Sequence, residues 1–220
     1  MNPGGPAILI MARAPRRGEV RRALEPMIGA DACLALQAAL IVQTVAWARE
    51  LQPRAINMAH DPPDAAAELR RLVGADVAMF PQNGDGITGR LADGAARVFS
   101  RGPGPLLIVW PDLPTWRPAH GHGALGDLRD GCDVVLGPVC EGGFYLVGIS
   151  RPTSELFKLP ESTWRGSDAM SLAAAASNHA GLGVGVLRVE RALHRPSDAR
   201  AALADPTLPE SVARLLGRGA

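Results

Sequence analysis

The sequence predicts a three-layer α/β/α fold in which helices cover both faces of a mostly parallel β-sheet. Apolar runs of strand length alternate with helical patterns through the first two-thirds of the chain. One run, Pro105–Asp112, is apolar enough to be buried on both faces, as in the centre of a parallel sheet. The close runs Asp133–Val139 and Phe144–Ile149 indicate an added antiparallel pair.

The first part of the chain is expected to fold as strand, helix, strand, helix. Ala7–Arg13 is mostly apolar and is expected to form the first strand. Gly29–Gln52 has the broad apolar face of a long helix and stops before a proline. Arg54–Ala59 is short and half polar, as in a second strand. Pro62–Val73 begins with a proline start signal and is expected to be a second helix.

The next elements lead into the central strand and past it. Asp76–Phe80 is expected to be a strand, and Ile87–Ser100 a helix that follows a glycine-rich turn. Ala119–Arg129 is a weak helix rich in Gly and His. After the antiparallel pair, four further elements are expected. These are the helix Ser167–His179, the strand Gly181–Val189 and the helices Pro196–Ala204 and Glu210–Leu216.

Composition indicates one soluble domain over residues 1–220. The hydrophobic fraction of 47% is enough for a full core. The net charge of +1 gives no field that would favour nucleic acid or an anionic membrane. The apolar stretch Ala32–Ala48 contains polar residues and is shorter than the roughly 20 residues that span a bilayer. Three cysteines without a CxxC motif fit a reducing cytoplasm.

Asp112 is the first candidate for a functional residue, because it follows the central strand. Ligands of open α/β sheets bind beyond the carboxyl ends of the strands. A carboxylate there can hold a divalent cation, Mg²⁺ or Mn²⁺, against a phosphate. The sequence Asp112-Leu113-Pro114 is also ordinary turn chemistry, so a turn or cap aspartate is an equal alternative.

Two loops could contact an anionic ligand. The loop 14–27 follows the first strand, and together with Arg13 it brings five arginines. Arginine pairs with phosphate oxygens through two parallel hydrogen bonds, although a solvated basic loop would look the same. The glycine-rich turn 81–86 places backbone amides at a helix start, where an anion or a plain cap fits equally.

Other catalytic patterns are missing or weak. The chain contains no GxxxxGK[ST], no GxGxxG after the first strand and no GxSxG. These absences argue against a P-loop NTPase, a dinucleotide dehydrogenase and an esterase-like serine nucleophile. His120 and His122 are two apart, a spacing that can chelate a metal, but a surface or structural histidine pair is the more ordinary interpretation.

Four sequence blocks, taken together, resemble a known family. They are Ala12-Arg13-Ala14-Pro15 with Gly18 and Leu24-Glu25-Pro26, Pro81-Gln82 with Gly89-Arg90-Leu91, Asp112-Leu113-Pro114-Thr115, and Val135–Pro138 with Gly142-Gly143-Phe144-Tyr145. The family is the bacterial domain of unknown function 2064, also described as radical-SAM/selenodomain-associated transferases. It is similar to nucleotide-diphospho-sugar transferases of the glycosyltransferase-A, Rossmann-like fold. It is also similar to guanylyltransferases that activate phospholactate-type acids. The resemblance covers about Ile8 to Ala199.

The resemblance implies a site for each block. Asp112 would hold the cation, and Glu141 would be a second ligand or a base for the acceptor. The nucleotide site would include Arg13, Pro15, Gly18, Arg21, Gln82 and Arg90. Of these, Gln82 would contact the base or ribose, while Gly142 and Gly143 would let the backbone approach the acceptor or sugar.

The sequence departs from the family pattern at several positions. The first loop has Arg21-Arg22-Ala23 where lysine-threonine-arginine is usual, and Glu141 replaces an aspartate. Trp110-Pro111 stands where a glycine and a small hydroxyl residue are usual. A late aspartate pair is replaced by a segment with Ala192, His194 and Arg195-Pro196, so His194 is a substitute candidate for the metal.

Two hypotheses follow. The first is a nucleotide-dependent transferase, a glycosyltransferase or nucleotidyltransferase, that uses a nucleotide or nucleotide-sugar, a divalent cation and a small-molecule acceptor. The second is a catalytically impaired protein of the same fold that binds nucleotides or a partner. The missing aspartates motivate the second hypothesis.

Overall fold

The computed structural model describes residues 4–164 and 166–217. The predicted single domain 1–220 therefore includes residues 1–3, 165 and 218–220, which lie outside the described part. Seven strands form one sheet in the order β3-β2-β1-β4-β6-β5-β7. Their bounds are β1 Ala7–Arg13, β2 Ala55–Asp61, β3 Val77–Pro81, β4 Leu106–Val109, β5 Val134–Pro138, β6 Phe144–Ile149 and β7 Val184–Val186.

The predicted sheet is confirmed, including its antiparallel pair. Strands β1, β2, β3 and β4 run parallel, and β5 runs parallel to β7. Strand β6 alone is antiparallel to its neighbours, pairing with both β5 and β4. The hairpin expected between β5 and β6 therefore does more than extend the edge, because β6 joins the two parallel halves of the sheet.

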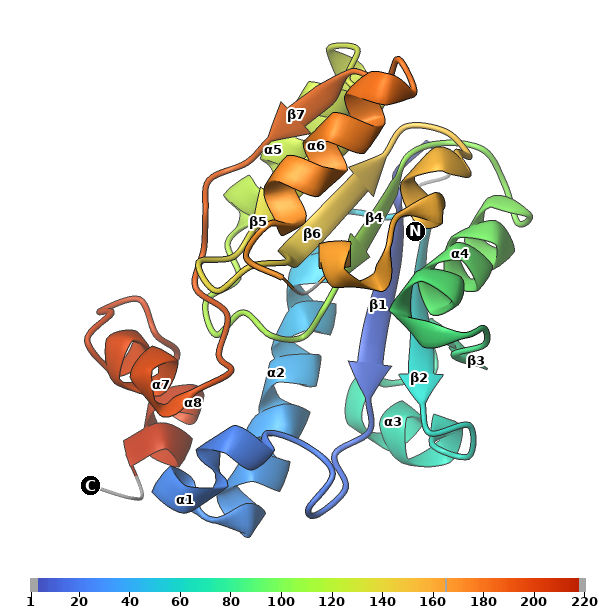
Figure 1. The fold of residues 1–220 in the computed structure, drawn as a ribbon. Helices are drawn as coiled ribbons and strands as arrows, with labels where there is room; N and C mark the ends of the chain where they lie inside the picture. Colours follow the sequence, from blue (N-terminus) through green and yellow to red (C-terminus); the bar gives the residue numbers. More distant parts are fainter. Residues whose placement is uncertain (1–3, 165, 218–220) are drawn as a thin grey trace.

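Helices cover both faces of this sheet, as predicted (Figure 1). The α-helices are α1 Glu25–Ile28, α2 Ala30–Glu50, α3 Ala66–Val73, α4 Gly86–Phe99, α5 Pro118–Arg129, α6 Ala169–His179, α7 Pro196–Leu203 and α8 Glu210–Leu216. Three 3₁₀ turns complete the described elements, and these are η1 Arg22–Leu24, η2 Glu155–Lys158 and η3 Glu161–Trp164.

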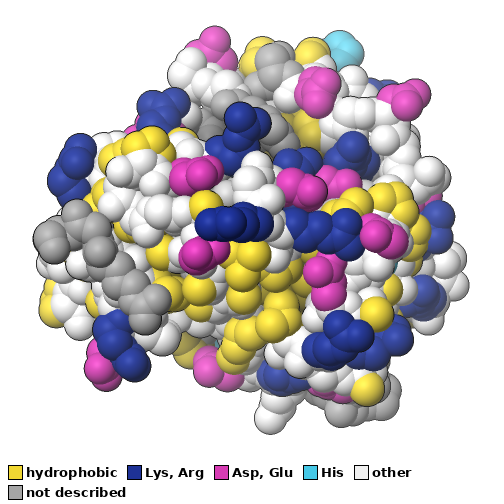
Figure 2. Space-filling view, turned by 90° about the horizontal axis from the view of Figure 1, so that it is seen from below, with side chains coloured by type: hydrophobic (Ala, Val, Ile, Leu, Met, Phe, Trp, Pro, Cys, Tyr) yellow, Lys and Arg dark blue, Asp and Glu magenta, His cyan; other side chains and the backbone are white. Residues whose placement is uncertain are grey.

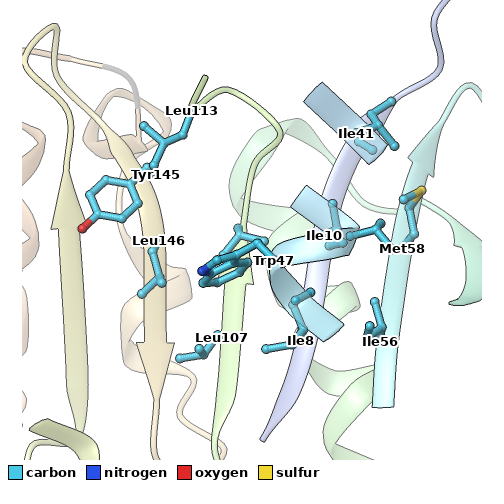
Figure 3. Close-up of a cluster of buried hydrophobic side chains, with 14 of the residues drawn as sticks. Ile8, Ile10, Ile41, Trp47, Ile56, Met58, Leu107, Leu113, Tyr145 and Leu146 are labelled. Atoms are coloured by element: carbon cyan, nitrogen blue, oxygen red, sulfur yellow. The ribbon is translucent and has the colours of Figure 1, made fainter. Parts of the chain in front are cut away.

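The alternation of side chains along each strand divides the core into two layers. Ile8 and Ile10 of β1 pack with α2, α3 and α5 on one face. Leu9 and Met11 point the other way, against α4, α6, η2 and η3. Figure 3 shows the first layer, where Trp47 of α2 points towards the side chains of the central strands. A third cluster joins α1, α7 and α8 to the first half of α2.

Helix α2 is the core helix of this arrangement. It is long and apolar enough to cross a membrane by length and composition alone, yet half of that window is buried inside the fold. Leu36, Leu40 and Ile41 are fully buried, and they contact the cluster of α7 and α8 or the sheet. This burial accounts for the apolar residues on the face that α2 turns towards the core.

Two strands are shorter than the sequence predicts. The central run Pro105–Asp112 forms a strand only at Leu106–Val109, because its last pair with β6 is Val109. Trp110, Pro111 and Asp112 then turn out of the sheet. Similarly, the run Gly181–Val189, expected as a strand, forms a strand only at Val184–Val186. Three residues of β5 pair with this short strand.

Candidate functional site

The parallel strands bring four polar side chains to one edge of the sheet. Arg13 ends β1, Asp61 ends β2, Gln82 follows β3 and Asp112 lies three residues beyond β4. Because these strands are neighbours, their carboxyl ends open onto the same crevice. Asp112 therefore reaches the position predicted for it, beyond the central strand and beside a cleft.

The cleft has two lobes. The first lobe has a volume of about 510 Å³, and the second lobe of about 520 Å³. Six residues line both lobes, namely Arg13, Arg21, Ile87, Trp110, Asp112 and His194. Figure 2 shows the face onto which the parallel strands end, where basic and acidic side chains lie side by side next to an apolar area. Asp112 and His194 thus lie at the junction of one continuous cleft.

The first lobe is completed mainly by the first loop, β2 and α4. It is lined in addition by Met11, Glu19, Val20, Arg22, Ala23, Gln37, Asp61, Gln82, Gly86, Arg90, Pro111 and Glu161. The second lobe is completed by the turn between β5 and β6, by η3 and by the segment after β7. Its other lining residues are Val139, Glu141, Gly142, Gly143, Phe144, Trp164 and Arg195.

Arg21 lies at the centre of the cleft floor, and its side chain is only 6% exposed. Its guanidinium donates to Gln37 Oε1 at 2.8 Å, to the carbonyl of Leu193 at 2.8 Å and to that of Pro111 at 2.6 Å. A further hydrogen bond of 2.8 Å reaches Asp112 Oδ1. Arg21 therefore ties the first loop to the end of β4 and to the segment after β7.

The carboxylate of Asp112 is partly accessible from the cleft. The side chain is 27% exposed, and Arg21 contacts Oδ1. The backbone carbonyl of Asp112 accepts a 2.8 Å hydrogen bond from the N–H of Leu193, which places His194 on the adjoining strip of chain. Asp112 Oδ2 accepts no hydrogen bond from the part of the chain that the structure describes. This oxygen is the one that could contact a ligand or cation.

The residues present suit a cation shared with a ligand better than a resident ion. Across residues 4–164 and 166–217, no three His, Cys, Asp or Glu side chains gather closely enough to hold a metal. Asp112 and His194 offer one carboxylate and one imidazole. Mg²⁺ in phosphate sites is commonly bound through one or two carboxylates, with phosphates and water completing its coordination. Asp112 therefore fits such an ion only together with bound phosphates, whereas the imidazole of His194 is a nitrogen ligand that transition metals accept more readily than Mg²⁺.

Arg13 belongs to a polar network across the ends of β1, β2 and β3. Its Nε and Nη2 donate to Asp61 Oδ2 at 3.0 and 2.8 Å. Arg90 on α4 lies 3.9 Å from the same oxygen and donates to Gln82 Oε1 at 3.5 Å. The amide of Gln82 in turn donates to the carbonyl of Ala59 at 3.0 Å. These contacts fix the first-lobe side of the cleft, and they bring together the predicted residues Arg13, Gln82 and Arg90.

Most arginines of the first loop are paired with carboxylates. Arg16 contacts Asp64 and Glu68, and the hydrogen bond from Arg16 lowers the pKa of Asp64. Arg17 contacts Asp31. The loop is therefore held against α2 and the α3 region by ion pairs. The predicted residues Pro15 and Gly18 belong to this loop but are not among the residues that line either lobe.

The second lobe brings together the predicted residues of the turn between β5 and β6. Glu141 accepts from Arg191 Nη1 at 3.4 Å and from Arg195 Nη1 at 3.2 Å. Gly142 and Gly143 follow with φ values of 91° and 89°. A Cβ on Gly142 would overlap the backbone carbonyl of Gly166, so this turn requires glycine for close packing as well as for its conformation.

Sequence reasoning missed several cleft residues. Asp61 is the last residue of β2, so an acidic residue at the carboxyl end of a strand was a usable signal, as it was for Asp112 near β4. Glu161 had no signal, because its contact with the start of α4, a 3.2 Å hydrogen bond from the Ile87 N–H, joins residues 74 apart. Trp110 and Trp164 line the second lobe, and neither was a predicted site residue.

His120 and His122 do not form a metal site. The segment is helical, so their spacing places the two side chains on different sides of α5. His120 is buried, and its Nε2 lies 3.2 Å from Glu190 Oε1. Burial lowers the pKa of His120, while Glu190 opposes this shift. His122 is exposed.

Comparisons with known proteins give a family and a fold. The model of a family described as "Uncharacterized protein conserved in bacteria (DUF2064)" matches residues 41–162. No curated protein matches the chain.

Solved structures share the fold at low sequence identity. A protein from Desulfovibrio desulfuricans G20, provisionally assigned as a nucleotide-diphospho-sugar transferase, superimposes with a TM-score of 0.85. It is 20% identical, and 96% of this chain and 93% of that chain are covered. A 4-diphosphocytidyl-2C-methyl-D-erythritol synthase gives a TM-score of 0.57 at 13% identity, covering 91% and 97% of the two chains. A CMP:2-keto-3-deoxy-manno-octonic acid synthetase complexed with CTP gives 0.53 at 17% identity, covering 89% and 96%.

Proposed function

Because this chain belongs to the DUF2064 family and has the fold of nucleotide-sugar and nucleotidyl transferases, we propose that it is a nucleotide-dependent transferase. The reaction would transfer a glycosyl or nucleotidyl group to a small-molecule acceptor. The observation that carries the proposal is the position of Asp112. This carboxylate lies beyond the central strand, at the junction of two lobes of similar volume.

The first lobe supplies the polar groups that a nucleotide needs. Arg13 and Arg90 lie near its wall, with Gln82 between the strand ends. Arg13 is 54% exposed at its side chain, so it can reach a phosphate while it stays in contact with Asp61. Gln82 would contact the base or ribose. Arg21 would act mainly through Asp112, because its own donors are already engaged within the protein.

Asp112, with His194 lining the same cleft, would hold a divalent cation, Mg²⁺ or Mn²⁺. Bound there, it would neutralise charge that develops on the leaving phosphate. Asp112 would hold the cation through the oxygen that Arg21 does not contact. Arg21, in turn, would keep Asp112 in one orientation.

The second lobe would bind the acceptor. Gly142 and Gly143 allow the backbone of the turn to approach it closely. Glu141 would position an acceptor hydroxyl or accept its proton, and the two neighbouring guanidiniums fix its carboxylate. We expect the reaction to take place in the cytoplasm, which agrees with three free cysteines.

A thermal-shift screen tests the proposal directly. The protein is heated with nucleoside triphosphates and nucleotide-sugars, each with and without Mg²⁺ or Mn²⁺. A ligand that binds the folded state raises the melting temperature by mass action. We expect at least one nucleotide to stabilise the protein, and the effect to require the cation. No stabilisation by any nucleotide would contradict the proposal.

A second candidate is a nucleotide-binding or partner-binding protein without catalysis. It is favoured by the lack of a three-ligand metal cluster among the described residues. Under this candidate, nucleotides stabilise the protein equally with and without a cation, and no nucleotide is consumed during incubation with acceptors. Cation-dependent stabilisation and nucleotide turnover would support the transferase instead.

A further inference from the structure

The second lobe has an apolar wall. Trp110 is its most exposed aromatic residue, whereas Val139, Phe144 and Trp164 are only 5–8% exposed and present the edges of buried side chains. The rings of Phe144 and Trp164 meet edge to face at 6.1 Å. The indole N–H of Trp164 already donates to Thr88 Oγ1 at 3.0 Å. The indole therefore has no free donor to offer a ligand, and the wall suits an apolar or planar body.

Arg195 lines the same lobe, and part of its guanidinium is unoccupied. Its Nη1 donates to Glu141 Oε2 at 3.2 Å, which fixes the side chain on one side. Its Nε and Nη2 contact no acceptor in the described part of the chain, and the side chain is 65% exposed. That edge of a guanidinium pairs with a carboxylate or phosphate through two parallel hydrogen bonds.

The nearby charges do not cancel Arg195. Glu141 is one carboxylate shared between Arg191 and Arg195. Asp112 also lines the second lobe, where it pairs with Arg21, and Asp198 has a fully buried side chain. Its oxygens accept from Arg191 Nη1 and from the N–H groups of His194 and Arg195. The charge of Asp198 is therefore directed into the start of α7, and the only carboxylate that contacts the guanidinium of Arg195 among the described residues is that of Glu141, which Arg191 shares.

We propose that the second lobe binds a small organic acid, whose anionic group pairs with Arg195 and whose apolar body packs on Trp110, Phe144 and Trp164. The inference rests on the proposed function, because it names the chemical class of the acceptor. An uncharged sugar would leave the open edge of Arg195 without a charged partner.

Benzoate, benzamide and acetate are suitable probes, because they separate charge from apolar surface. Binding is followed by the indole ¹⁵N–¹H signals of the four tryptophans in the chain. Trp110 and Trp164 line the second lobe. Trp47 and Trp116 stack at 4.1 Å in the other core layer and serve as internal controls.

We expect benzoate to shift the signals of Trp110 and Trp164 and to leave those of Trp47 and Trp116 in place. Its dissociation constant should be at least about tenfold lower than that of benzamide or acetate, since a charge-assisted pair and a buried ring each contribute. Equal affinities for benzoate and benzamide would overturn the proposal. So would the lack of any shift of Trp110 and Trp164 up to the solubility limit of benzoate.

Arg195→Ala should raise the dissociation constant of benzoate to that of benzamide and leave benzamide unaffected. Arg195→Lys, which keeps the charge but loses the fork, should be intermediate. Arg200→Ala removes the same charge from an exposed position on the same helix, and it should change neither probe. Benzoate affinity that survives Arg195→Ala would refute the role of Arg195.

Nucleotide binding, measured by calorimetry on the same samples, separates this proposal from the transferase proposal. Binding of benzoate without binding of any nucleotide would refute the transferase proposal but would still support an organic-acid site at Arg195. Binding of a nucleotide together with failure of the benzoate tests would overturn only the acid site.

Discussion

Replacing Arg21 by alanine tests whether this residue organises the cleft. The guanidinium is 6% exposed and donates four hydrogen bonds, to Gln37, Pro111, Leu193 and Asp112. At roughly 1 kcal/mol for each bond lost, and with acceptors left without a donor, we expect a cost of about 3–5 kcal/mol. Arg21 has a left-handed φ of 52°, and alanine retains that backbone strain, so no relief offsets the loss.

Urea unfolding followed by circular dichroism gives the free energy of unfolding of each variant. Arg21→Lys should lower the free energy of unfolding by a large part of the same amount, because an ammonium group cannot form the same set of hydrogen bonds as a planar guanidinium. Arg17→Ala is the matched control. Arg17 pairs with Asp31, but the two side chains are 67% and 86% exposed, so the change should be about 0–1 kcal/mol. A cost below about 1 kcal/mol for Arg21→Ala would refute the reasoning.

Two further predictions concern the core. Gly137→Ala places a Cβ 2.6 Å from the ring of the buried Tyr145, so we expect urea unfolding to show a loss of roughly 1–3 kcal/mol; an unchanged midpoint would contradict the packing. The pKa of His120 is lowered in the folded protein, so the unfolded chain binds more protons and stability should fall as the pH drops below about 6.5. His120→Gln should flatten this part of the stability profile and His122→Gln should not; equal profiles for both variants would argue against the role of His120.

The strands and their mostly parallel direction could be predicted because their signals are local, whereas the order of the strands in the sheet comes from the structure. β1 and β4 are apolar runs buried on both faces, and the run of β4 alone places Asp112 at the ligand edge of the sheet. The exact end of β4 could not be predicted in the same way. It depends on where β6 stops pairing, and β6 lies about 40 residues further along the chain.

The charge pairs of the cleft could not be predicted, because they join distant segments. Arg195 and Glu141 are separated by 54 residues, and Arg21 and Asp112 by 91. The arginines of the first loop predicted a phosphate cradle, whereas the fold pairs several of them with carboxylates of the protein. Which arginine keeps a free edge for a ligand depends on these tertiary contacts and not on composition.

Calorimetry of Asp112→Asn tests the central claim most directly. The amide keeps an oxygen that can accept from Arg21, so the fold should survive while the negative charge is lost. Asp130→Asn, at an exposed position at the end of α5, is the matched control. With the nucleotide identified by the thermal-shift screen, we predict that Asp112→Asn loses Mg²⁺-dependent binding by at least about tenfold, as expected for a lost charged contact. Folded Asp112→Asn protein that binds the Mg²⁺-nucleotide as tightly as Asp130→Asn would contradict the account.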